Sequence, residues 1–193
     1  ADDVIGTLAT EAGRQGITTY MMTPDKDYGQ LVSDKVFMYR PKHTGGFEVM
    51  GVDEVKAKFD IQSPAQVIDM LGLMGDSSDN IPGCPGVGEK TAQKLIAEFG
   101  SIENLLEHTD QLKGALKTKV ETNREMITFS KFLATIKIDV PIQLDMDSLV
   151  REQADEDSLR QIFEELEFRT LIDRVLKKEN AGNGITTPTG NKT

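Results

Sequence analysis

The chain has 193 residues, of which 38% are hydrophobic and 28% charged, so it can form a globular core. Its net charge of −10 argues against a general polyanion binder, and its single cysteine, Cys84, excludes an internal disulfide framework and favours a reducing, cytoplasmic setting. The sequence shows neither an apolar run long enough to cross a bilayer nor a secretory signal pattern, so we expect no membrane partner.

The first fifty residues alternate between helical and strand patterns. In chain order, the expected elements are a helix from Asp2 to Gly13, a buried strand at 18–23, a short helix at 28–32, and strands at 36–40 and 47–50. Because the connections are short and helices alternate with strands, this order predicts an α/β layer with a mostly parallel sheet.

Beyond Val52, apolar residues recur with the helical period. The predicted helices cover residues 52–59, 64–74, 89–99 and 102–107, a long one covers 112–136, and a last one, capped by Asp157 or Ser158, runs to about Leu176. We expect four parts: residues 1–74 as the later part of an α/β core, 75–138 as a metal-ligand turn and duplex-binding region, 139–178 as a helical closure, and 179–193 as a flexible linker.

Three pairs of aspartates stand at the ends of predicted elements. They are Asp2 with Asp3 at a helix start, Asp25 with Asp27 after a strand, and Asp76 with Asp79 in a turn between helices. Carboxylates suit Mg²⁺ or Mn²⁺, and two such ions can stabilise both oxygens of a phosphodiester displacement. Each pair by itself also fits a helix-dipole partner or a turn, and only their joint occurrence favours a metal site.

A glycine turn follows the last aspartate pair and opens a helix. It is not a nucleoside-triphosphate P-loop, because Glu89 separates Gly88 from Lys90 and no strand precedes it. It favours a helix-hairpin-helix, whose backbone amides bind duplex phosphates without reading the bases. The candidate DNA-binding residues are Gly83, Gly86, Val87, Gly88, Lys90, Thr91 and Lys94. The basic segment 111–138 could also face DNA, although a solvated helix face explains it equally well.

At these motifs the sequence closely resembles the 5′-nuclease domain of bacterial DNA polymerase I, within the flap endonuclease family. The matching segments are Ala1–Asp3, Thr23–Asp27, Gly75–Gly83 and Gly86–Ala92, and the resemblance runs to about Leu176. It implies a PIN-like α/β fold followed by a helix-three-turn-helix that binds duplex DNA. It also implies that the six aspartates bind Mg²⁺ or Mn²⁺, with no catalytic group beyond these ligands, and that K⁺ binds at the hairpin turn.

The resemblance further implies structure-specific hydrolysis of 5′ flaps, nicks and RNA primers, in primer removal and DNA repair, by a cytoplasmic, nucleoid-associated protein that also carries polymerase domains. The family has a glutamate just before the position of Ala1, upstream strand aspartates and a helical arch, none of which is in this sequence. Tyr28-Gly29 replaces Leu-Tyr of many relatives, which we interpret as a local packing variant. We therefore expect the second part of a nuclease domain, nearly inactive alone.

Two other interpretations stay open at this point. In the first, the chain is a non-catalytic duplex-binding module, whose carboxylates are only caps and turns and whose DNA binding depends on salt but not on metal. In the second, it is a soluble α/β fragment with neither property. A Mn²⁺ titration separates the metal-binding interpretation from both.

Overall fold

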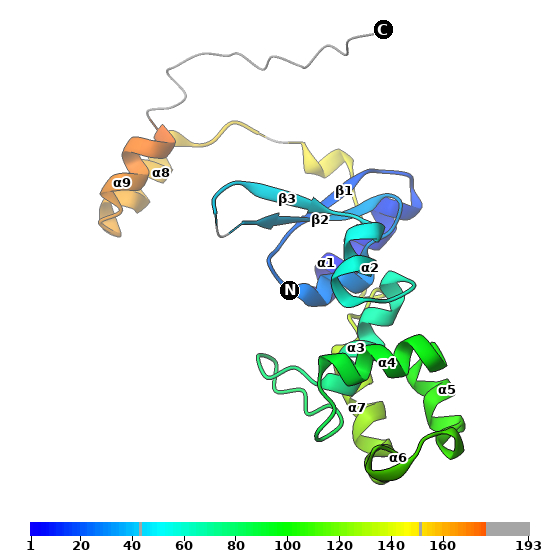
Figure 1. The fold of residues 1–193 in the computed structure, drawn as a ribbon. Helices are drawn as coiled ribbons and strands as arrows, with labels where there is room; N and C mark the ends of the chain where they lie inside the picture. Colours follow the sequence, from blue (N-terminus) through cyan, green and yellow to red (C-terminus); the bar gives the residue numbers. More distant parts are fainter. Residues whose placement is uncertain (43, 151, 177–193) are drawn as a thin grey trace, which may run out of the picture. The chain divides into compact units, whose positions relative to one another are not determined.

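The structure, a computed structural model, describes residues 1–42, 44–150 and 152–176 (Figure 1). These residues belong to two units, one from Ala1 to Leu144 and one that begins at Asp145. Among the described residues, no helix has both the length and the apolar character needed to cross a membrane.

A three-stranded sheet forms the β part of the first unit, in the order β1 (Thr19–Met22), β2 (Val36–Pro41), β3 (Phe47–Met50). The β1–β2 pair is parallel and the β2–β3 pair is antiparallel. The α/β class is therefore confirmed, and the parallel part of the sheet is the β1–β2 pair. The second pair is antiparallel because residues 42–46 are too few for a parallel crossover.

One face of this sheet is buried and the other is exposed. Met21 in β1 is 4% exposed, whereas its neighbours Tyr20 and Met22 are 56% and 73% exposed. The prediction of a buried strand at this position is thus wrong for one face, because successive side chains point to opposite sides of a strand. On the exposed face the ring of Tyr20 stacks on Phe37, with centroids 5.6 Å apart.

Two helical elements flank the first strand, α1 (Asp2–Arg14) and the 3₁₀ helix η1 (Lys26–Leu31). The acidic residues in the first turn of α1 suit the positive end of its dipole. We predicted a helix at 28–32; the observed one begins two residues earlier because Asp25 caps it, its carboxylate accepting a hydrogen bond from the backbone N–H of Asp27 at 3.0 Å.

The remaining elements of the first unit are helical. They are α2 (Val52–Phe59), η2 (Pro64–Gln66), α3 (Val67–Met74), α4 (Glu89–Phe99), α5 (Ile102–Glu107), η3 (Thr109–Gln111), α6 (Gly114–Thr122) and α7 (Arg124–Ala134). The prediction of a single helix over 112–136 is wrong, because the chain leaves helical geometry at Asn123. The Asn123 side chain donates to the carbonyl of Lys119 at 2.8 Å and ends α6.

The second unit contains η4 (Asp147–Leu149), α8 (Glu156–Glu165), α9 (Arg169–Leu171) and the π-helix η5 (Ile172–Leu176). Asp155, and not Asp157 or Ser158, caps α8, and it accepts a hydrogen bond from the N–H of Ser158 at 3.0 Å. The predicted continuous helix to Leu176 is wrong, because Glu167, with a φ of 57°, interrupts it. The linker predicted at 179–193 lies outside the described residues.

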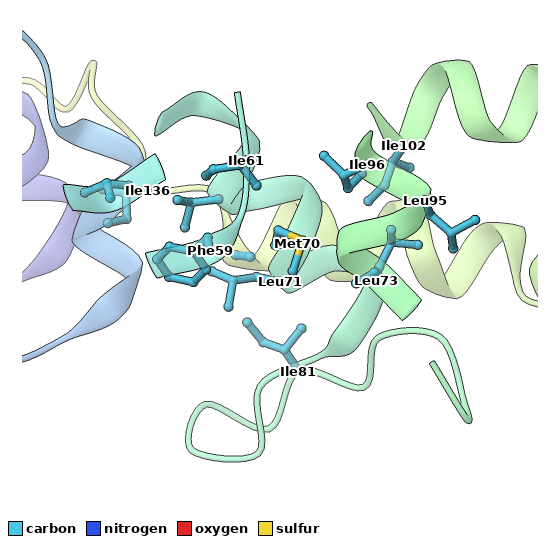
Figure 2. Close-up of a cluster of buried hydrophobic side chains, with 14 of the residues drawn as sticks. Phe59, Ile61, Met70, Leu71, Leu73, Ile81, Leu95, Ile96, Ile102 and Ile136 are labelled. Carbon is cyan, nitrogen blue, oxygen red and sulfur yellow. The ribbon is translucent and has the colours of Figure 1, made fainter. Parts of the chain in front are cut away.

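Helix α3 runs through the core of the first unit, next to α4 and α7 (Figure 1). Its Met70, Leu71 and Leu73 are fully buried (Figure 2). Ile81, from the loop that follows α3, is 7% exposed and packs into the same core. Burying such a side chain contributes about 1.5–3 kcal/mol, so Ile81 anchors this loop to the core.

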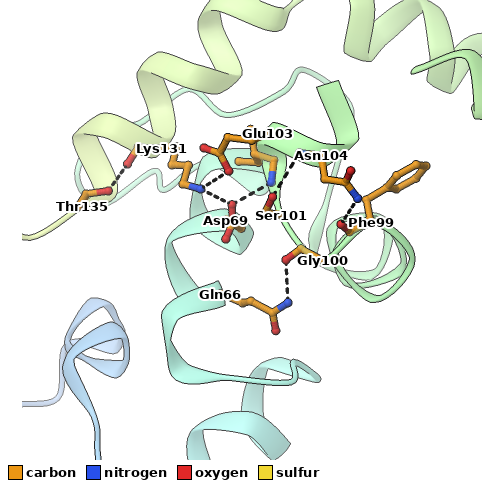
Figure 3. Close-up of polar contacts among 10 residues, drawn as sticks. Gln66, Asp69, Phe99, Gly100, Ser101, Glu103, Asn104, Lys131 and Thr135 are labelled. Carbon is orange, nitrogen blue, oxygen red and sulfur yellow. Dashed lines mark hydrogen bonds and ion pairs between the residues drawn. The ribbon is translucent and has the colours of Figure 1, made fainter. Parts of the chain in front are cut away.

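An ion-pair network around the buried Asp69 ties α3 to α5 and α7 (Figure 3). Asp69 of α3 is 4% exposed and accepts hydrogen bonds from the ammonium of Lys131 at 2.6 Å and the backbone N–H of Ile102 at 3.0 Å. Lys131 also donates to Glu103 at 2.8 Å. The network therefore fixes helix α3, from whose end the loop with two of the candidate metal ligands starts.

Candidate metal centre and nucleic-acid interface

Three of the six predicted metal ligands converge in the structure. Asp27 of η1 and Asp76 and Asp79 of the loop after α3 each offer a carboxylate oxygen, and these oxygens lie within 4.8 Å of one another. Asp27 and Asp76 are 9% and 5% exposed, whereas Asp79 is exposed. Oxygen ligands at this spacing suit a hard divalent cation.

The other three aspartates lie on a cleft beside this cluster. Asp2, Asp3 and Asp25 line a cleft of about 290 Å³, together with Asp27 and Asp79. The structure thus brings five of the six aspartates to one cleft, and the sixth, Asp76, joins it through the cluster. Among the described residues, only the cluster of three lies within mutual ligand distance.

Hydrogen bonds fix the three outer carboxylates. Asp2 accepts from the hydroxyl of Tyr28 at 2.8 Å, and Asp3 accepts from the backbone N–H of Lys137 at 2.9 Å. Asp25 accepts from the N–H of Asp27, as the cap of η1. Because a carboxylate has two oxygens with several lone pairs, each bond orients the side chain and leaves acceptor capacity for a cation.

Tyr28, which we interpreted as a packing variant, thus contacts a candidate ligand. Burial, followed by the hydrogen bond to Asp2, raises the pKa of the Tyr28 hydroxyl above its usual range, so the group stays a donor. No periodic or spacing signal in the sequence could have paired it with Asp2.

Lys26 places a positive charge inside the cluster. Its ammonium hydrogen-bonds the Oδ2 of Asp76 and lies 3.7 Å from the Oδ1 of Asp27. Burial alone would raise the pKa of Asp76, but the bond from Lys26 and the N–H of Ser78 hold it below its usual value. For Lys26, burial would lower the pKa, yet the bond to Asp76 and the charge of Asp27 raise it.

Asp27 is largely buried, and one of its carboxylate oxygens lacks a hydrogen bond within the described part of the chain. Burial, and after it the charge of Asp25, raises the pKa of Asp27 to about 6. Its Oδ1 is buried and has no hydrogen-bond partner among the described residues. Among the described side chains, the Lys26 ammonium, 3.7 Å away, is the nearest positive charge to this oxygen but is beyond hydrogen-bond distance. A buried carboxylate oxygen without a hydrogen bond, beside two further carboxylates, fits a divalent cation, which would supply the missing partner.

The loop that carries Asp76 and Asp79 closes on itself. The backbone N–H of Asp76 donates to the carbonyl of Ile81 at 2.9 Å, and the reverse bond measures 2.7 Å. Gly75 and Gly83 meet at the base of the loop with φ of 74° and 63°, and a Cβ on Gly83 would lie 2.3 Å from the Gly75 nitrogen. Only glycine fits here, so the loop geometry depends on this close approach.

Helix α7 holds the far end of this loop. The backbone N–H of Gly83 donates to the hydroxyl of Ser130 at 3.0 Å, and Ser130 is fully buried. The next N–H, of Cys84, donates to the carbonyl of Leu73 in α3 at 2.7 Å. Sequence reasoning missed Ser130, since a lone serine in a helix gives no signal of a bond across the fold.

The predicted DNA-binding residues lie between α3 and α4 and along α4. Gly83 and Val87 are buried and shape the hairpin, Thr91 is partly exposed, and the exposed members are Gly86, Gly88, Lys90 and Lys94. Val87, at 4% exposure, anchors the turn in the core and leaves only its backbone for an external contact.

Lys119 of α6 reaches the same turn. Its ammonium donates to the carbonyl of Gly86 at 3.3 Å. Gly86 has a φ of 77°, and a Cβ there would lie 2.6 Å from the Lys119 Nζ. A positive charge from the chain thus lies at the turn where the resemblance places a monovalent cation.

The structure combines an acidic cleft, a glycine hairpin that follows the Asp76/Asp79 loop, and a small α/β layer followed by helices, an arrangement that suits a nuclease. Two family models match the chain: "5'-3' exonuclease, N-terminal resolvase-like domain" over residues 1–60 and "5'-3' exonuclease, C-terminal SAM fold" over residues 62–157. The chain belongs to the 5′-3′ exonuclease family.

Curated relatives agree with this assignment. The chain is 44% identical over 177 residues to DNA polymerase I of Bacillus subtilis and 42% identical over 173 residues to the thermostable DNA polymerase I of Thermus filiformis. These matches cover 91% and 89% of this chain but 20% of each relative, so the chain spans about a fifth of their length. The predicted resemblance to the exonuclease domain of DNA polymerase I is confirmed.

Solved structures show the same fold. T5 5′-exonuclease with bound zinc matches with a TM-score of 0.62 at 22% identity, over 69% of this chain and 48% of that one. The flap endonuclease of bacteriophage T5 in a complex with DNA and metal ions matches with a TM-score of 0.60 at 23% identity, over 69% and 48%. The catalytic core of Rad2 matches with a TM-score of 0.53 at 16% identity, over 82% and 58%.

Proposed function

We propose that this chain supplies metal ligands and a duplex-binding hairpin to a 5′-3′ exonuclease that cleaves 5′ flaps and nicked duplexes. The observation that carries the proposal is the convergence of Asp27 of η1 with Asp76 and Asp79 within 4.8 Å. Asp76 and Asp79 lie on the loop that leads directly into the glycine hairpin. Metal ligands and a phosphate-binding turn on one continuous segment suit a metal-dependent phosphodiesterase.

The three clustered aspartates would hold one Mg²⁺ or Mn²⁺, and Asp2, Asp3 and Asp25 on the same cleft would complete a second site. When bound, such ions supply Lewis-acid stabilisation of the phosphate oxygens and activate water. The protein's part is to orient the carboxylates through Tyr28, Lys137 N–H and the η1 cap, and to hold the Asp76/Asp79 loop through Ile81 and Ser130.

The hairpin would bind the DNA backbone. Gly86 and Gly88 let phosphate approach the backbone amides at the start of α4, and Lys90 and Lys94 add exposed positive charge. Such contacts position a duplex without reading its sequence. K⁺ at the turn, polymerase domains on the same polypeptide, and a role in primer removal and repair near the nucleoid belong to the same proposal, supported by the match to DNA polymerase I.

A chimera tests the proposal. In it, this chain replaces the matching segment of Bacillus subtilis DNA polymerase I, and the polymerase activity of the same polypeptide controls for folding. We expect Mg²⁺-dependent cleavage of a 5′-flap duplex that EDTA abolishes. Asp76→Asn should remove most of the cleavage and leave flap binding, while Asp60→Asn, an exposed aspartate that does not line the cleft, should change neither.

Cleavage that survives both EDTA and Asp76→Asn would contradict the metal assignment. A chimera that polymerises and binds flap DNA in a salt-dependent way, but does not cleave it with any divalent metal, would instead identify a non-catalytic duplex-binding module.

A further inference from the structure

One side-chain amide joins the Asp27 turn to the end of α7. Gln30 of η1 donates from its Nε2 to the carbonyls of Asp27 and Ala134, at 2.9 Å in both cases. Its Oε1 accepts from the backbone N–H of Ile136 at 2.9 Å. Both N–H groups of this amide and its oxygen are therefore engaged with backbone groups of η1 and of the end of α7.

The backbone groups that Gln30 binds lie where helix α7 ends at Ala134. Carbonyls in the last turn of a helix lack hydrogen-bond partners within the helix, and the backbone groups of the residues after it make no helical hydrogen bonds. The amide of Gln30 takes the place of a backbone peptide there. If it were removed, water could satisfy these groups, so the fold would survive while the spacing between η1 and α7 became less defined.

The segment that Gln30 holds forms one wall of the acidic cleft. Residues 133–136 line the cleft together with the aspartates. The next N–H, of Lys137, orients the carboxylate of Asp3, and upstream on the same helix Ser130 holds Gly83 at the end of the Asp76/Asp79 loop.

One stretch of chain therefore contacts every acid-bearing element. It reaches the Asp76/Asp79 loop through Ser130, the Asp3 carboxylate through the Lys137 N–H, and η1, with Asp27, through Gln30. The first two contacts come from the stretch itself, whereas the third depends on the side chain of Gln30.

We propose that Gln30 is a positioning residue for the metal centre, which sets the spacing between Asp27 and the segment that orients Asp3 and the Asp76/Asp79 loop. The inference rests on the proposed function, since the centre it positions is the one described there. Gln30 does not itself lie among the residues that line the cleft, so it acts through the groups it binds.

The chain offers a matched control in Gln66 (Figure 3). Gln66 also binds backbone through its side-chain amide: it donates to the carbonyl of Gly100 at 2.7 Å and accepts from the N–H groups of Gln62 and Ser63 at 2.7 and 3.1 Å. It makes the same number of bonds to backbone groups, one donated and two accepted, but it lies in η2 and does not line the cleft.

The test compares Gln30→Met with Gln66→Met in the full chain. Mn²⁺ affinity is measured by electron paramagnetic resonance, and stability by urea unfolding without metal. We expect both variants to lower the urea midpoint by similar amounts, and only Gln30→Met to weaken Mn²⁺ binding, by about 10–100-fold, as loss of a group that orients metal ligands does. Gln30→Glu keeps the oxygen that accepts from Ile136 and loses the two donated bonds, so it should also weaken Mn²⁺ binding. It replaces Gln30→Met in this test if that variant does not fold.

Unchanged Mn²⁺ affinity in the Gln30 variants, or equal weakening in Gln66→Met, would overturn this inference and leave the proposed function standing. A wild-type chain that does not bind Mn²⁺ would overturn both.

Discussion

The ammonium of Lys26 hydrogen-bonds the carboxylate of Asp76 at the centre of the acidic cluster, with the Oδ1 of Asp27 3.7 Å away. The Lys26 side chain thus places one positive charge among these carboxylates. It offsets the repulsion among carboxylates that the fold brings within 4.8 Å of one another. A divalent ion would therefore compete with Lys26 for Asp76.

Replacing Lys26 by methionine should have opposite effects on stability and metal affinity. Without metal, Lys26→Met leaves the buried Asp76 carboxylate unpaired, and we expect the free energy of unfolding to fall by about 3 kcal/mol. The variant should bind Mn²⁺ more tightly, because the ion no longer has to displace the Lys26 ammonium from Asp76. Saturating Mn²⁺ should therefore stabilise the variant more than the wild type and recover most of this loss. Urea unfolding with and without Mn²⁺ measures both effects, and weaker Mn²⁺ binding in the variant would show that Lys26 supports the ion instead of competing with it.

Ser130→Ala should destabilise the protein by about 1–3 kcal/mol, because it leaves the buried N–H of Gly83 without a partner. Hydrogen exchange at that N–H should speed up, since it closes the loop that carries Asp76 and Asp79. Thr128→Ala is the control on the same helix: its exposed hydroxyl donates only to the carbonyl of Arg124, at 3.0 Å. Equal effects of the two substitutions on urea unfolding and exchange would contradict the assigned role of Ser130.

The Glu103–Lys131 contact predicts a dependence of stability on pH. Burial would raise the pKa of Glu103, but the hydrogen bond from Lys131 lowers it below the ordinary value of 4.5. A carboxyl whose pKa is lowered on folding stabilises the protein above its unfolded pKa, and this contribution is lost as the pH falls through its folded pKa. The Glu103 side chain is 64% exposed, so we expect less than about 1 kcal/mol.

The measurement for Glu103 is the difference in free energy of unfolding between the wild type and Glu103→Gln. This difference should be present at pH 6 and should shrink as the pH falls below 4.5. A difference that stays constant or grows at low pH would contradict the lowered pKa.

Lys90→Ala and Lys94→Ala should each weaken duplex binding by similar factors for unrelated sequences and lower the slope of log affinity against log salt by about 1. The reason is that an exposed lysine at a phosphate releases about one counterion. Lys42→Ala, an exposed lysine outside the hairpin, is the control. Fluorescence anisotropy at several salt concentrations measures the slope, and an unchanged slope in both hairpin variants would remove the hairpin from the DNA-binding surface.

The candidate ligands could be predicted from the sequence because each aspartate pair stands at the end of an element, where side chains of different elements can meet. The contacts of Lys26 with Asp76, of Gln30 with the end of α7, and of Ser130 with Gly83 could not be predicted. Hydrogen bonds between distant parts of the chain leave no periodic pattern in the sequence. The break at Asn123 escaped prediction for a related reason: apolar spacing continues through it, and only a local side-chain bond to Lys119 ends the first helix.

The central claim is that the clustered carboxylates bind a divalent cation, and a Mn²⁺ titration of the chain tests it most directly. Asp79 is the best position to change, because it is exposed and its loss should leave the fold intact. We predict that the wild type and Asp60→Asn bind Mn²⁺ with the same affinity and that Asp79→Asn binds it at least about tenfold more weakly. Equal affinity in all three proteins, or no binding by the wild type, would contradict the account.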